Sequence, residues 1–168
     1  MVEIDHLLEG AESVKIALSD KKALFEFDNT VIATRLIAGE YPNTKNIVPR
    51  ITNYSLEVNA SDLLKAIDRV NILSIDRENV VDLHLSEDSV EISAKSTQVG
   101  SASEKIETFK FEGNNLQISF NCEFVSSAVR ALGSEDVTLL FVGEMKPFVI
   151  KNPNDESIIQ IVTPVRTY

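Results

Sequence analysis

The sequence predicts an α+β fold in which antiparallel sheets lie on the outside and two helices pack together on one side. The first observation is that short runs of alternating, β-branched or aromatic residues recur along the chain in three sets of three. The second is that a strand followed by an amphipathic helix precedes the second and third sets. Residues 52–168 therefore comprise two copies of a strand–helix–three-strand unit, and residues 1–50 comprise the end of a third copy.

The partial copy begins with a short helix. Ile4, Leu7 and Leu8 supply its apolar positions, and Gly10 is expected to end it. A helix this short is marginal by itself because nucleation is costly, so we expect the chain to begin inside a domain. The three strands that follow are expected at residues 14–18, 23–27 and 31–37.

A connector is expected between the partial copy and the first complete copy. Gly39, Pro42 and Pro49 fall close together there, and they favour an extended backbone. We therefore expect two domains, one at residues 1–50 that includes the connector and one at residues 51–168.

Each complete copy opens with a strand and a capped helix. The first is expected to have a strand at 56–58, a helix at 61–72 and strands at 80–85, 90–94 and 106–111. The second is expected to have a strand at 116–120, a helix at 123–132 and strands at 137–142, 148–151 and 158–162. Asn59 and Asn121 stand where a side chain can accept hydrogen bonds from the first helical turn. Gly133 stands where a left-handed C-terminal cap is expected.

Composition restricts the classes of function. Hydrophobic residues make up 43% of the chain, enough for a core, and the net charge is −10. DNA repels such a chain on average, so any action on DNA requires basic residues concentrated on one face or a topological grip. The single Cys122, the lack of a signal peptide and the lack of a long apolar run favour a cytoplasmic protein without membrane contact.

Catalytic and metal sites are not expected. His6 and His84 lie far apart in the chain, and neither has a Cys or His at metal-ligand spacing. Cys122 follows a helix cap, a position that can lower a thiol pKa, but no histidine stands near it in sequence and packing is the simpler role. The chain has no glycine-rich phosphate loop, GxSxG elbow or HExxH motif. We therefore expect no enzyme and no cofactor. A small hydrolase, the alternative, requires acidic or histidine side chains that converge in a cleft.

Four segments resemble a known family. Similarity to bacterial DNA sliding clamps, the β subunit of DNA polymerase III, is found in residues 39–49 (GEYPNTKNIVP), 66–74 (AIDRVNILS), 119–132 (SFNCEFVSSAVRAL) and 163–168 (TPVRTY), in the family's order and spacing. The resemblance covers essentially the whole chain and includes no catalytic motif. It implies the DNA-clamp fold and a processivity factor of the replicative polymerase, which encloses double-stranded DNA and catalyses no reaction.

The resemblance also implies that part of a subunit is missing. A clamp subunit has three similar domains of two units each, and this chain corresponds to the end of the second domain and the whole third domain. Clamp rings close head to tail between the first domain of one subunit and the third domain of the next. The full-length protein is therefore expected to be a ring homodimer, and the chain itself is expected to be a C-terminal fragment.

A peptide-binding pocket is a further implication of the resemblance. In the family, the catalytic subunit of the replicative polymerase, the clamp loader and repair polymerases insert short linear motifs into an apolar pocket between the second and third domains. Carried over by position, the partner-peptide-binding residues are Pro42, Asn46, Ile47, Asn121, Phe124, Met145, Pro147, Ile161, Thr163, Pro164, Val165 and Arg166. One wall of the pocket belongs to the missing sequence, so we expect weaker binding than a full subunit shows. The alternative is that Phe124, Met145 and Ile161 are core residues.

Contact with DNA is the second role that the resemblance implies. Lys65, Arg69 and Arg130 on the two helices are expected to face the phosphates. Three acidic residues share these helices, so the lining is only mildly positive, which suits sliding. Surface charge without a DNA role is the alternative for each cation. For the whole chain the alternative is a non-enzymatic peptide-binding module unrelated to replication, which would lack the likeness between the two copies.

Overall fold

The computed structural model describes residues 2–40, 44, 47–74 and 78–167. The chain divides into two compact units, Met1–Pro42 and Asn43–Tyr168. This division lies inside the expected connector. Each unit has its own cluster of buried hydrophobic residues.

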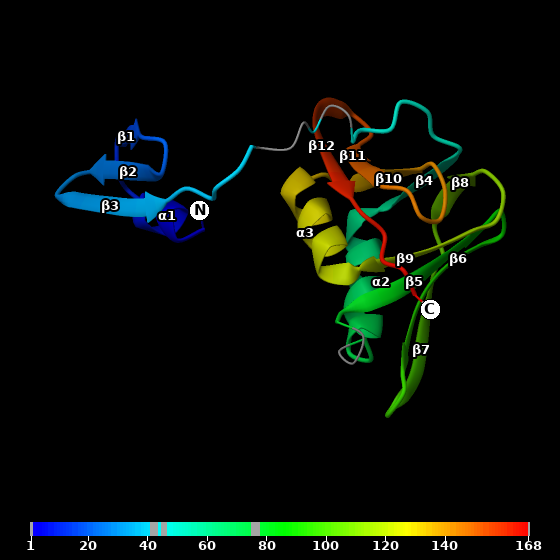
Figure 1. Ribbon diagram of the computed structural model, residues 1–168. Helices are drawn as coiled ribbons and strands as arrows, with labels where there is room; N and C mark the ends of the chain where they lie inside the picture. The colour runs from blue at the N-terminus through cyan, green and yellow to red at the C-terminus, as the bar shows by residue number, and fades with distance from the viewer. Residues whose placement is uncertain (1, 41–43, 45–46, 75–77, 168) are drawn as a thin grey trace. The chain divides into compact units, whose positions relative to one another are not determined.

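The smaller unit is a helix packed on a three-stranded antiparallel sheet (Figure 1). Its elements are α1 (Val2–Leu7), β1 (Lys15–Leu18), β2 (Lys22–Phe27) and β3 (Thr30–Arg35), in the sheet order β1-β2-β3. Strand β2 alternates exposed and buried residues, and its Ala23 and Phe25 form one cluster with Ile4 of α1. The helix ends at Leu7, before the turn that contains Gly10.

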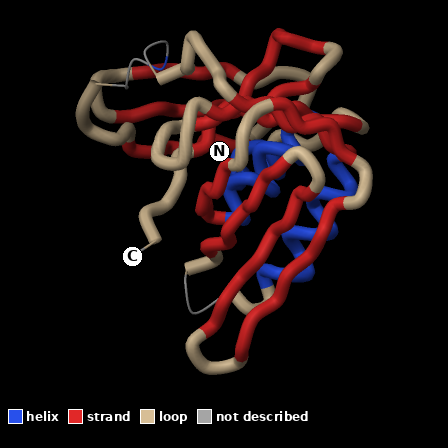
Figure 2. The backbone as a smooth tube through the Cα atoms, turned by 90° about the vertical axis from the view of Figure 1, so that its right-hand side faces the viewer, coloured by secondary structure: helices blue, strands red, loops and turns tan. Residues whose placement is uncertain are grey.

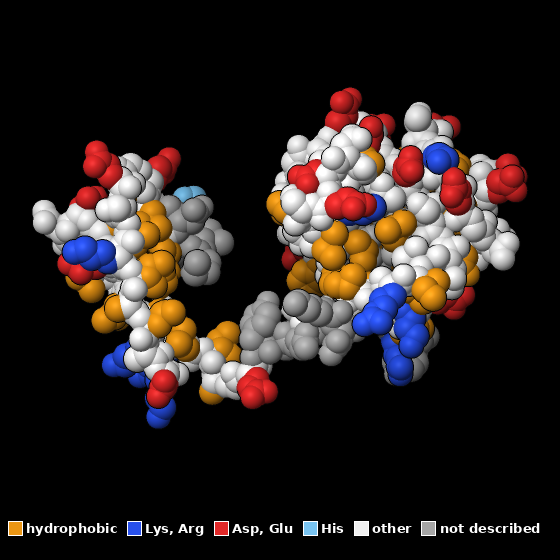
Figure 3. All heavy atoms as spheres, turned by 90° about the horizontal axis from the view of Figure 1, so that it is seen from above, with side chains coloured by type: hydrophobic (Ala, Val, Ile, Leu, Met, Phe, Trp, Pro, Cys, Tyr) orange, Lys and Arg blue, Asp and Glu red, His pale blue; other side chains and the backbone are white. Residues whose placement is uncertain are grey.

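The sheet of the smaller unit keeps apolar side chains exposed on the same face that packs against α1. Ile16 and Leu18 of β1 lie opposite Phe25 and Ala23, so they share the face that α1 covers. Their side chains are nevertheless 56% and 72% exposed. Figure 3 shows hydrophobic side chains gathered on the surface of this unit. The helix therefore covers only part of the apolar face of the sheet.

The larger unit contains two antiparallel sheets and two helices (Figure 1). Its elements are β4 (Tyr54–Asn59), α2 (Ala60–Asn71), β5 (Val80–Ser86), β6 (Ser89–Ser96), β7 (Gly100–Ile106), β8 (Phe109–Glu112), β9 (Leu116–Asn121), α3 (Cys122–Leu132), β10 (Asp136–Phe141), β11 (Phe148–Asn152) and β12 (Asp155–Val162). One sheet has the order β12-β11-β10-β4-β8, and the other has the order β7-β6-β5-β9. The predicted α+β class with antiparallel sheets is confirmed.

The two copies of the repeated unit exchange their first strands. Strand β4 of the first copy pairs with β10 of the second, and β9 of the second copy pairs with β5 of the first. Equivalent bonds accompany the two exchanges. The Ala60 N–H donates to the Glu135 carbonyl, and the Cys122 N–H donates to the Asn79 carbonyl, each at 2.8 Å. The predicted likeness between the copies is therefore confirmed, and each sheet contains strands from both.

Both long helices begin at the predicted asparagines. The Asn59 side chain accepts hydrogen bonds from two backbone amides in the first turn of α2, and the Asn121 side chain accepts one from the Glu123 amide. These amides have no carbonyl partner inside the helix, which is why a side-chain oxygen at the cap stabilises the helix. Gly133 ends α3 with a left-handed φ of 60°, as predicted.

The apolar faces of α2 and α3 form the centre of the core. Leu63 and Val70 of α2 and Val125 of α3 are fully buried, and the helices contact each other and both sheets. Figure 2 shows both helices along one side of the strands. Burial of each such side chain contributes about 1.5–3 kcal/mol. The opposite, polar faces of the helices are left to solvent.

The prediction of one strand at residues 106–111 is wrong. Strand β7 ends at Ile106, and β8 begins at Phe109 in the other sheet. Strand β7 is rich in serine and charged residues, so alternation does not mark it. It is held by backbone pairing along β6, its partner across the short turn at residues 97–99, and by non-local contact with α2. The other elements lie within three residues of their predicted bounds.

Candidate functional site

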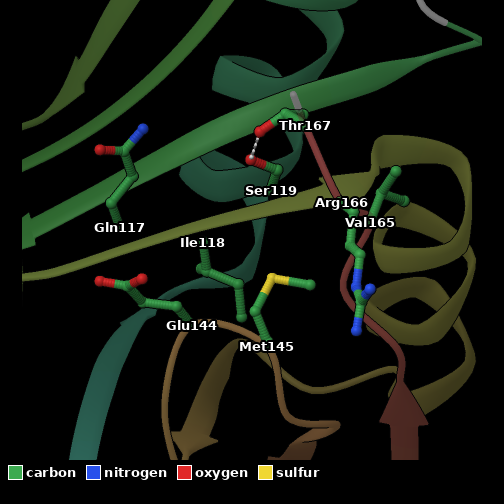
Figure 4. Close-up of a pocket in the computed structure, with 8 residues that line it drawn as sticks. All are labelled: Gln117, Ile118, Ser119, Glu144, Met145, Val165, Arg166 and Thr167. Carbon is green, nitrogen blue, oxygen red and sulfur yellow. Dashed lines mark hydrogen bonds between the residues drawn. The ribbon is translucent and has the colours of Figure 1, made fainter.

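A hollow of about 460 Å³ lies in the larger unit beside the C-terminal tail. Three segments line it (Figure 4). They contribute Gln117, Ile118 and Ser119 from β9, Glu144 and Met145 from the turn between β10 and β11, and Val165, Arg166 and Thr167 from the tail after β12. The hollow is therefore a product of tertiary folding, because these segments are separated in the sequence.

The tail is fastened to β9 through Ser119. The Val165 backbone N–H donates to the Ser119 carbonyl at 2.8 Å. The Ser119 hydroxyl donates to Asp82 Oδ1 at 2.5 Å and lies 3.3 Å from the Thr167 hydroxyl. Ser119 is buried and bonded through both its backbone and its side chain. This arrangement holds the tail beside the hollow in advance, which lowers the ordering cost of binding a ligand there.

The hollow has an apolar floor and a charged rim. Ile118 is buried, Val165 is half-buried, and the Met145 side chain, 48% exposed, reaches toward Ile118 (Figure 4). Glu144 and Arg166 are exposed and bring opposite charges to the rim. A floor of this kind suits an apolar side chain, and an unbranched methionine can repack around ligands of different shape.

Five of the predicted peptide-binding residues lie in or next to this hollow. Met145, Val165 and Arg166 line it. Thr163, which is exposed, and Pro164, which is half-buried, connect the end of β12 to the part of the tail that lines the hollow.

Four others are placed on neighbouring elements and do not line the hollow. Asn121 caps α3, and its side-chain amide also donates to the Glu78 carbonyl at 3.0 Å. Phe124 projects from the first turn of α3 and is 62% exposed. Pro147 immediately precedes β11, and Ile161 lies in β12, which contacts α3.

The connector contributes three predicted residues. Ile47 is 42% exposed, whereas Pro42 and Asn46 lie outside the described residues. The alternative that the apolar candidates belong to the core is wrong for Phe124 and Met145, since both side chains are largely exposed. Their exposure leaves them available to a partner.

Sequence reasoning missed five of the residues that line the hollow. These are Gln117, Ile118, Ser119, Glu144 and Thr167. A signal for the first three was present, because polar residues alternate with buried apolar ones along β9. That alternation indicates which side chains leave the core, but it does not indicate that the tail returns to the same strand.

The three predicted DNA-facing cations are exposed on the helices, and each lies beside a carboxylate. The shortest nitrogen–oxygen distances are 3.9 Å for Lys65 and Asp62, 2.9 Å for Arg69 and Glu104, and 3.8 Å for Arg130 and Asp68. Exposed pairs of this kind contribute little to stability, about 0–1 kcal/mol. Their main consequence is that the positive charge of the helix face is largely balanced within the chain.

Other chemistry has little support in the described part of the chain. No cluster of three or more His, Cys, Asp or Glu side chains suited to a metal ion occurs among residues whose placement is described. Burial raises the pKa of the Cys122 thiol, although a hydrogen bond with Ser74 partly opposes this effect. The thiol is therefore a packing group.

None of the described helices is both long and apolar enough to cross a bilayer.

A second hollow, of about 510 Å³, adjoins the first and shares Gln117 and Glu144 with it. It also brings His84 and Glu91 together on the exposed side of the four-stranded sheet, where the two residues are cross-strand neighbours. Within the described residues, the His84 imidazole forms no hydrogen bond with a hydroxyl or a carboxylate. The hollow therefore brings a histidine and carboxylates into one cleft, as the hydrolase alternative requires, but no nucleophile bonded to an oriented base is found among the described residues that line it.

Two family models together match almost all of the chain. The model described as DNA polymerase III beta subunit, C-terminal domain, matches residues 45–166. The model described as DNA polymerase III beta subunit, central domain, matches residues 1–43. The Beta sliding clamp of Bacillus subtilis (strain 168) is 36% identical over an alignment of 171 positions. The alignment covers 100% of this chain and 45% of that protein.

Solved structures agree with these matches. The crystal structure of the DNA polymerase sliding clamp from Bacillus subtilis has a TM-score of 0.84 and 35% identity, covering 99% of this chain and 45% of that one. A sliding clamp from Bartonella birtlesii bound to griselimycin has a TM-score of 0.84 and 25% identity, covering 97% of this chain and 44% of that one. The chain spans about half the length of the relatives it matches. With its paired units, exchanged strands and two domain matches, the chain belongs to the family of bacterial DNA polymerase III beta subunits, the beta sliding clamps.

Proposed function

We propose that this chain is the C-terminal part of a cytoplasmic processivity factor, which encloses double-stranded DNA and recruits replication proteins to it. The full-length protein forms a ring homodimer and has no catalytic role of its own. Family membership supports the role in replication. The observation that carries recruitment is the hollow lined by Met145, Val165 and Arg166, beside a tail that is held in place by Ser119.

The ligand of this hollow is a short linear segment of a partner protein. The catalytic subunit of the replicative polymerase, the clamp loader and repair polymerases each present such a segment and exchange at the same place. An apolar side chain that enters the floor gains about 1.5–3 kcal/mol, and the opposite charges of Glu144 and Arg166 can bond polar groups at the rim. After the cost of association, one or two such anchors give a roughly micromolar affinity, which permits exchange.

The exposed faces of α2 and α3 are the surface that we assign to the duplex. Lys65, Arg69 and Arg130 give it cations, and neighbouring carboxylates moderate their attraction to phosphates. Strong phosphate contacts would resist sliding. The grip therefore depends on enclosure by the whole ring, and this chain contributes one part of the lining.

Fluorescence polarisation of a labelled peptide from the clamp-binding segment of a replicative polymerase tests the recruitment proposal. We expect saturable binding to the 168-residue chain, weaker than to a full-length clamp. Met145→Ala should raise Kd about fivefold, because it removes part of the apolar floor, and Met145→Leu should restore most of the affinity.

Ile158→Ala is the matched control for this experiment. Ile158 is also 48% exposed, but it does not line the hollow, so its truncation should leave Kd unchanged. The proposal fails if no binding occurs at high micromolar concentration, or if Met145→Ala and Ile158→Ala have the same effect.

A further inference from the structure

Strand β1 of the smaller unit leaves one edge of its backbone unpaired. Within the described residues, β1 pairs only with β2. The Ser19 N–H donates to the Lys22 carbonyl at 2.9 Å, which continues the register of this hairpin. Backbone groups point to alternate sides along an antiparallel strand. It follows that the N–H and carbonyl of Ala17 face β2, whereas those of Ile16 and Leu18 face the open edge.

The open edge of β1 lies beside uncovered apolar side chains. Ile16 and Leu18 are on the face that packs against α1, yet both are largely exposed. Leu7, at the end of α1, is more than half exposed as well. A row of open backbone groups beside exposed apolar side chains is a template for pairing with another chain.

The larger unit shows how the equivalent edge is closed elsewhere in this chain. Strands β5 and β10 each begin a set of three strands, as β1 does. On that edge β5 pairs with β9 and β10 pairs with β4, so each is closed by the other copy of the repeated unit, and the helices of the two copies contact each other. The last strands of those sets, β7 and β12, are edges of their sheets. The likeness assigns the missing partner to β1 and not to β3.

We propose that two copies of the 168-residue chain associate through their β1 strands, so that the two three-stranded sheets join across a two-fold axis. A second smaller unit brings both things that this edge lacks, open backbone groups and apolar side chains on the same face. Antiparallel pairing of a strand with itself is self-complementary, as a two-fold interface requires. The inference goes beyond the recruitment and DNA-binding proposals and does not depend on them.

The alternation of faces limits the register of this pairing. Pairing centred on Ala17 sets Ile16 opposite Leu18 of the second copy, so the exposed apolar side chains of β1 meet on the face that packs against α1. A shift by one residue would set them opposite side chains of the other face. In the centred register, Ile16 and Leu18 form hydrogen-bonded pairs. The two Ala17 residues form a non-hydrogen-bonded pair with Cα atoms about 4.5 Å apart.

Sedimentation equilibrium of the 168-residue chain tests the association. The monomer mass is 18.6 kDa, and we expect a monomer–dimer equilibrium that depends on protein concentration. Leu18→Lys should raise the dimer dissociation constant at least about tenfold, because it sets a charge against Ile16 of the second copy. Val31→Lys is the matched control, since Val31 is similarly exposed but lies in β3 on the opposite face of the sheet. It should leave the dissociation constant unchanged.

Disulfide cross-linking tests the register. Cysteines in a non-hydrogen-bonded antiparallel pair lie at the Cα distance that a disulfide spans, so Ala17→Cys should form a covalent dimer under mild oxidation. Ala33→Cys is the control, because Ala33 is also exposed on the same face of the sheet but lies in β3. Ala17→Cys should cross-link at least about tenfold faster, measured on non-reducing gels. The native Cys122 is buried in the larger unit and should not contribute.

The possible outcomes decide the inference. A dimer that is weakened by Leu18→Lys but not by Val31→Lys, and that cross-links through Ala17→Cys, supports it. A chain that stays monomeric at high micromolar concentration overturns it. A dimer that Leu18→Lys does not weaken, or that cross-links as fast through Ala33→Cys, uses another surface and overturns it as well. Circular dichroism and the melting temperature establish that the variants are folded, which the exposure of all four side chains leads us to expect.

Peptide binding is a separate measurement. A monomeric chain that still binds the labelled polymerase peptide removes the dimer and leaves recruitment intact. A dimer that binds no peptide does the reverse.

Discussion

The backbone N–H of Val165 and the carbonyl of Ser119 lie 2.8 Å apart, and their bond joins the C-terminal tail to the outer edge of β9. The same serine bonds through its hydroxyl to Asp82, which belongs to the neighbouring strand β5. One residue thus connects two strands of the sheet with the tail that borders the hollow. The shape of the hollow depends on this connection.

Substitution of Ser119 by alanine should loosen the tail. The change removes the hydroxyl that bonds to Asp82 and contacts Thr167, but it keeps the backbone bond to Val165. We expect a loss of about 1–2 kcal/mol in the free energy of unfolding, measured with urea, and faster exchange of the Val165 amide. Thr167→Val is the control that removes only the outer hydroxyl. Unchanged exchange at Val165 in Ser119→Ala would show that the hydroxyl does not position the tail.

Loss of either helix cap should lower the free energy of unfolding by a similar amount, but only one of the two losses should weaken peptide binding. Asn59→Ala and Asn121→Ala each remove a cap and should each cost about 1 kcal/mol in urea unfolding. Asn121 does not line the hollow, but it is a predicted peptide-binding residue and it ends β9, the strand that lines the hollow, whereas Asn59 ends β4. We therefore expect only Asn121→Ala to weaken peptide binding in fluorescence polarisation. Equal Kd values for the two variants would remove Asn121 from the site.

A glycine beside β4 is required by both conformation and space. Gly113 has a φ of +138°, and an added Cβ would lie 2.6 Å from Cδ1 of Tyr54 and 3.2 Å from the Asn53 carbonyl oxygen. Gly113→Ala should therefore lower the free energy of unfolding by about 1–3 kcal/mol. At Gly143 an added Cβ meets nothing within 4 Å, so Gly143→Ala is the control and should be nearly neutral. Similar melting temperatures for the two variants would contradict the assignment.

The Cys122 thiol should be inert in the folded chain. Its side chain is 1% exposed, and burial raises its pKa, so little thiolate is present at neutral pH. An aromatic disulfide reagent should react with it rapidly only after denaturation, because the thiol is buried. Any residual rate in the folded chain should rise with pH, because the thiolate fraction is still increasing below the raised pKa. Stoichiometric labelling of the native chain within minutes would show that the helix cap activates this residue.

Electrostatics alone should not hold this chain on DNA. The net charge is −10, and Lys65, Arg69 and Arg130 each lie beside a carboxylate. We expect no saturable binding to a short linear duplex in fluorescence anisotropy at an ionic strength of about 0.15 M. Tight binding at that salt concentration would contradict the view that enclosure supplies the grip.

Removal of the neighbouring carboxylates should strengthen the attraction to DNA. The double variant Glu104→Gln with Asp68→Asn frees Arg69 and Arg130 from their partners. At low salt its affinity for the duplex should exceed that of the unmodified chain, and its salt dependence should be steeper by about one per freed cation. The same substitutions at two exposed acidic residues of the smaller unit, Glu12 and Asp20, provide the control for net charge.

Local sequence was sufficient to predict the elements whose stability is local. Asn59, Asn121 and Gly133 were predicted as caps because capping involves only the next few residues, and the structure places all three at helix ends. The apolar stripes of α2 and α3 and the alternation of most strands were readable for the same reason. Strand β7 was not, because its polar sequence is held by pairing along β6 rather than by its own pattern.

By itself, the sequence determined the α+β class, the two capped helices, the likeness of the two copies and the family resemblance. Tertiary structure alone decided that β4 and β9 exchange sheets, and that Ser119 meets Val165 across a long stretch of chain. It also decided that Met145 borders the hollow while Phe124 stands outside it. The physical reason is that periodicity and capping depend on neighbours within a few residues. The pairing of a strand edge depends instead on which distant segment offers unsatisfied backbone groups at the right place.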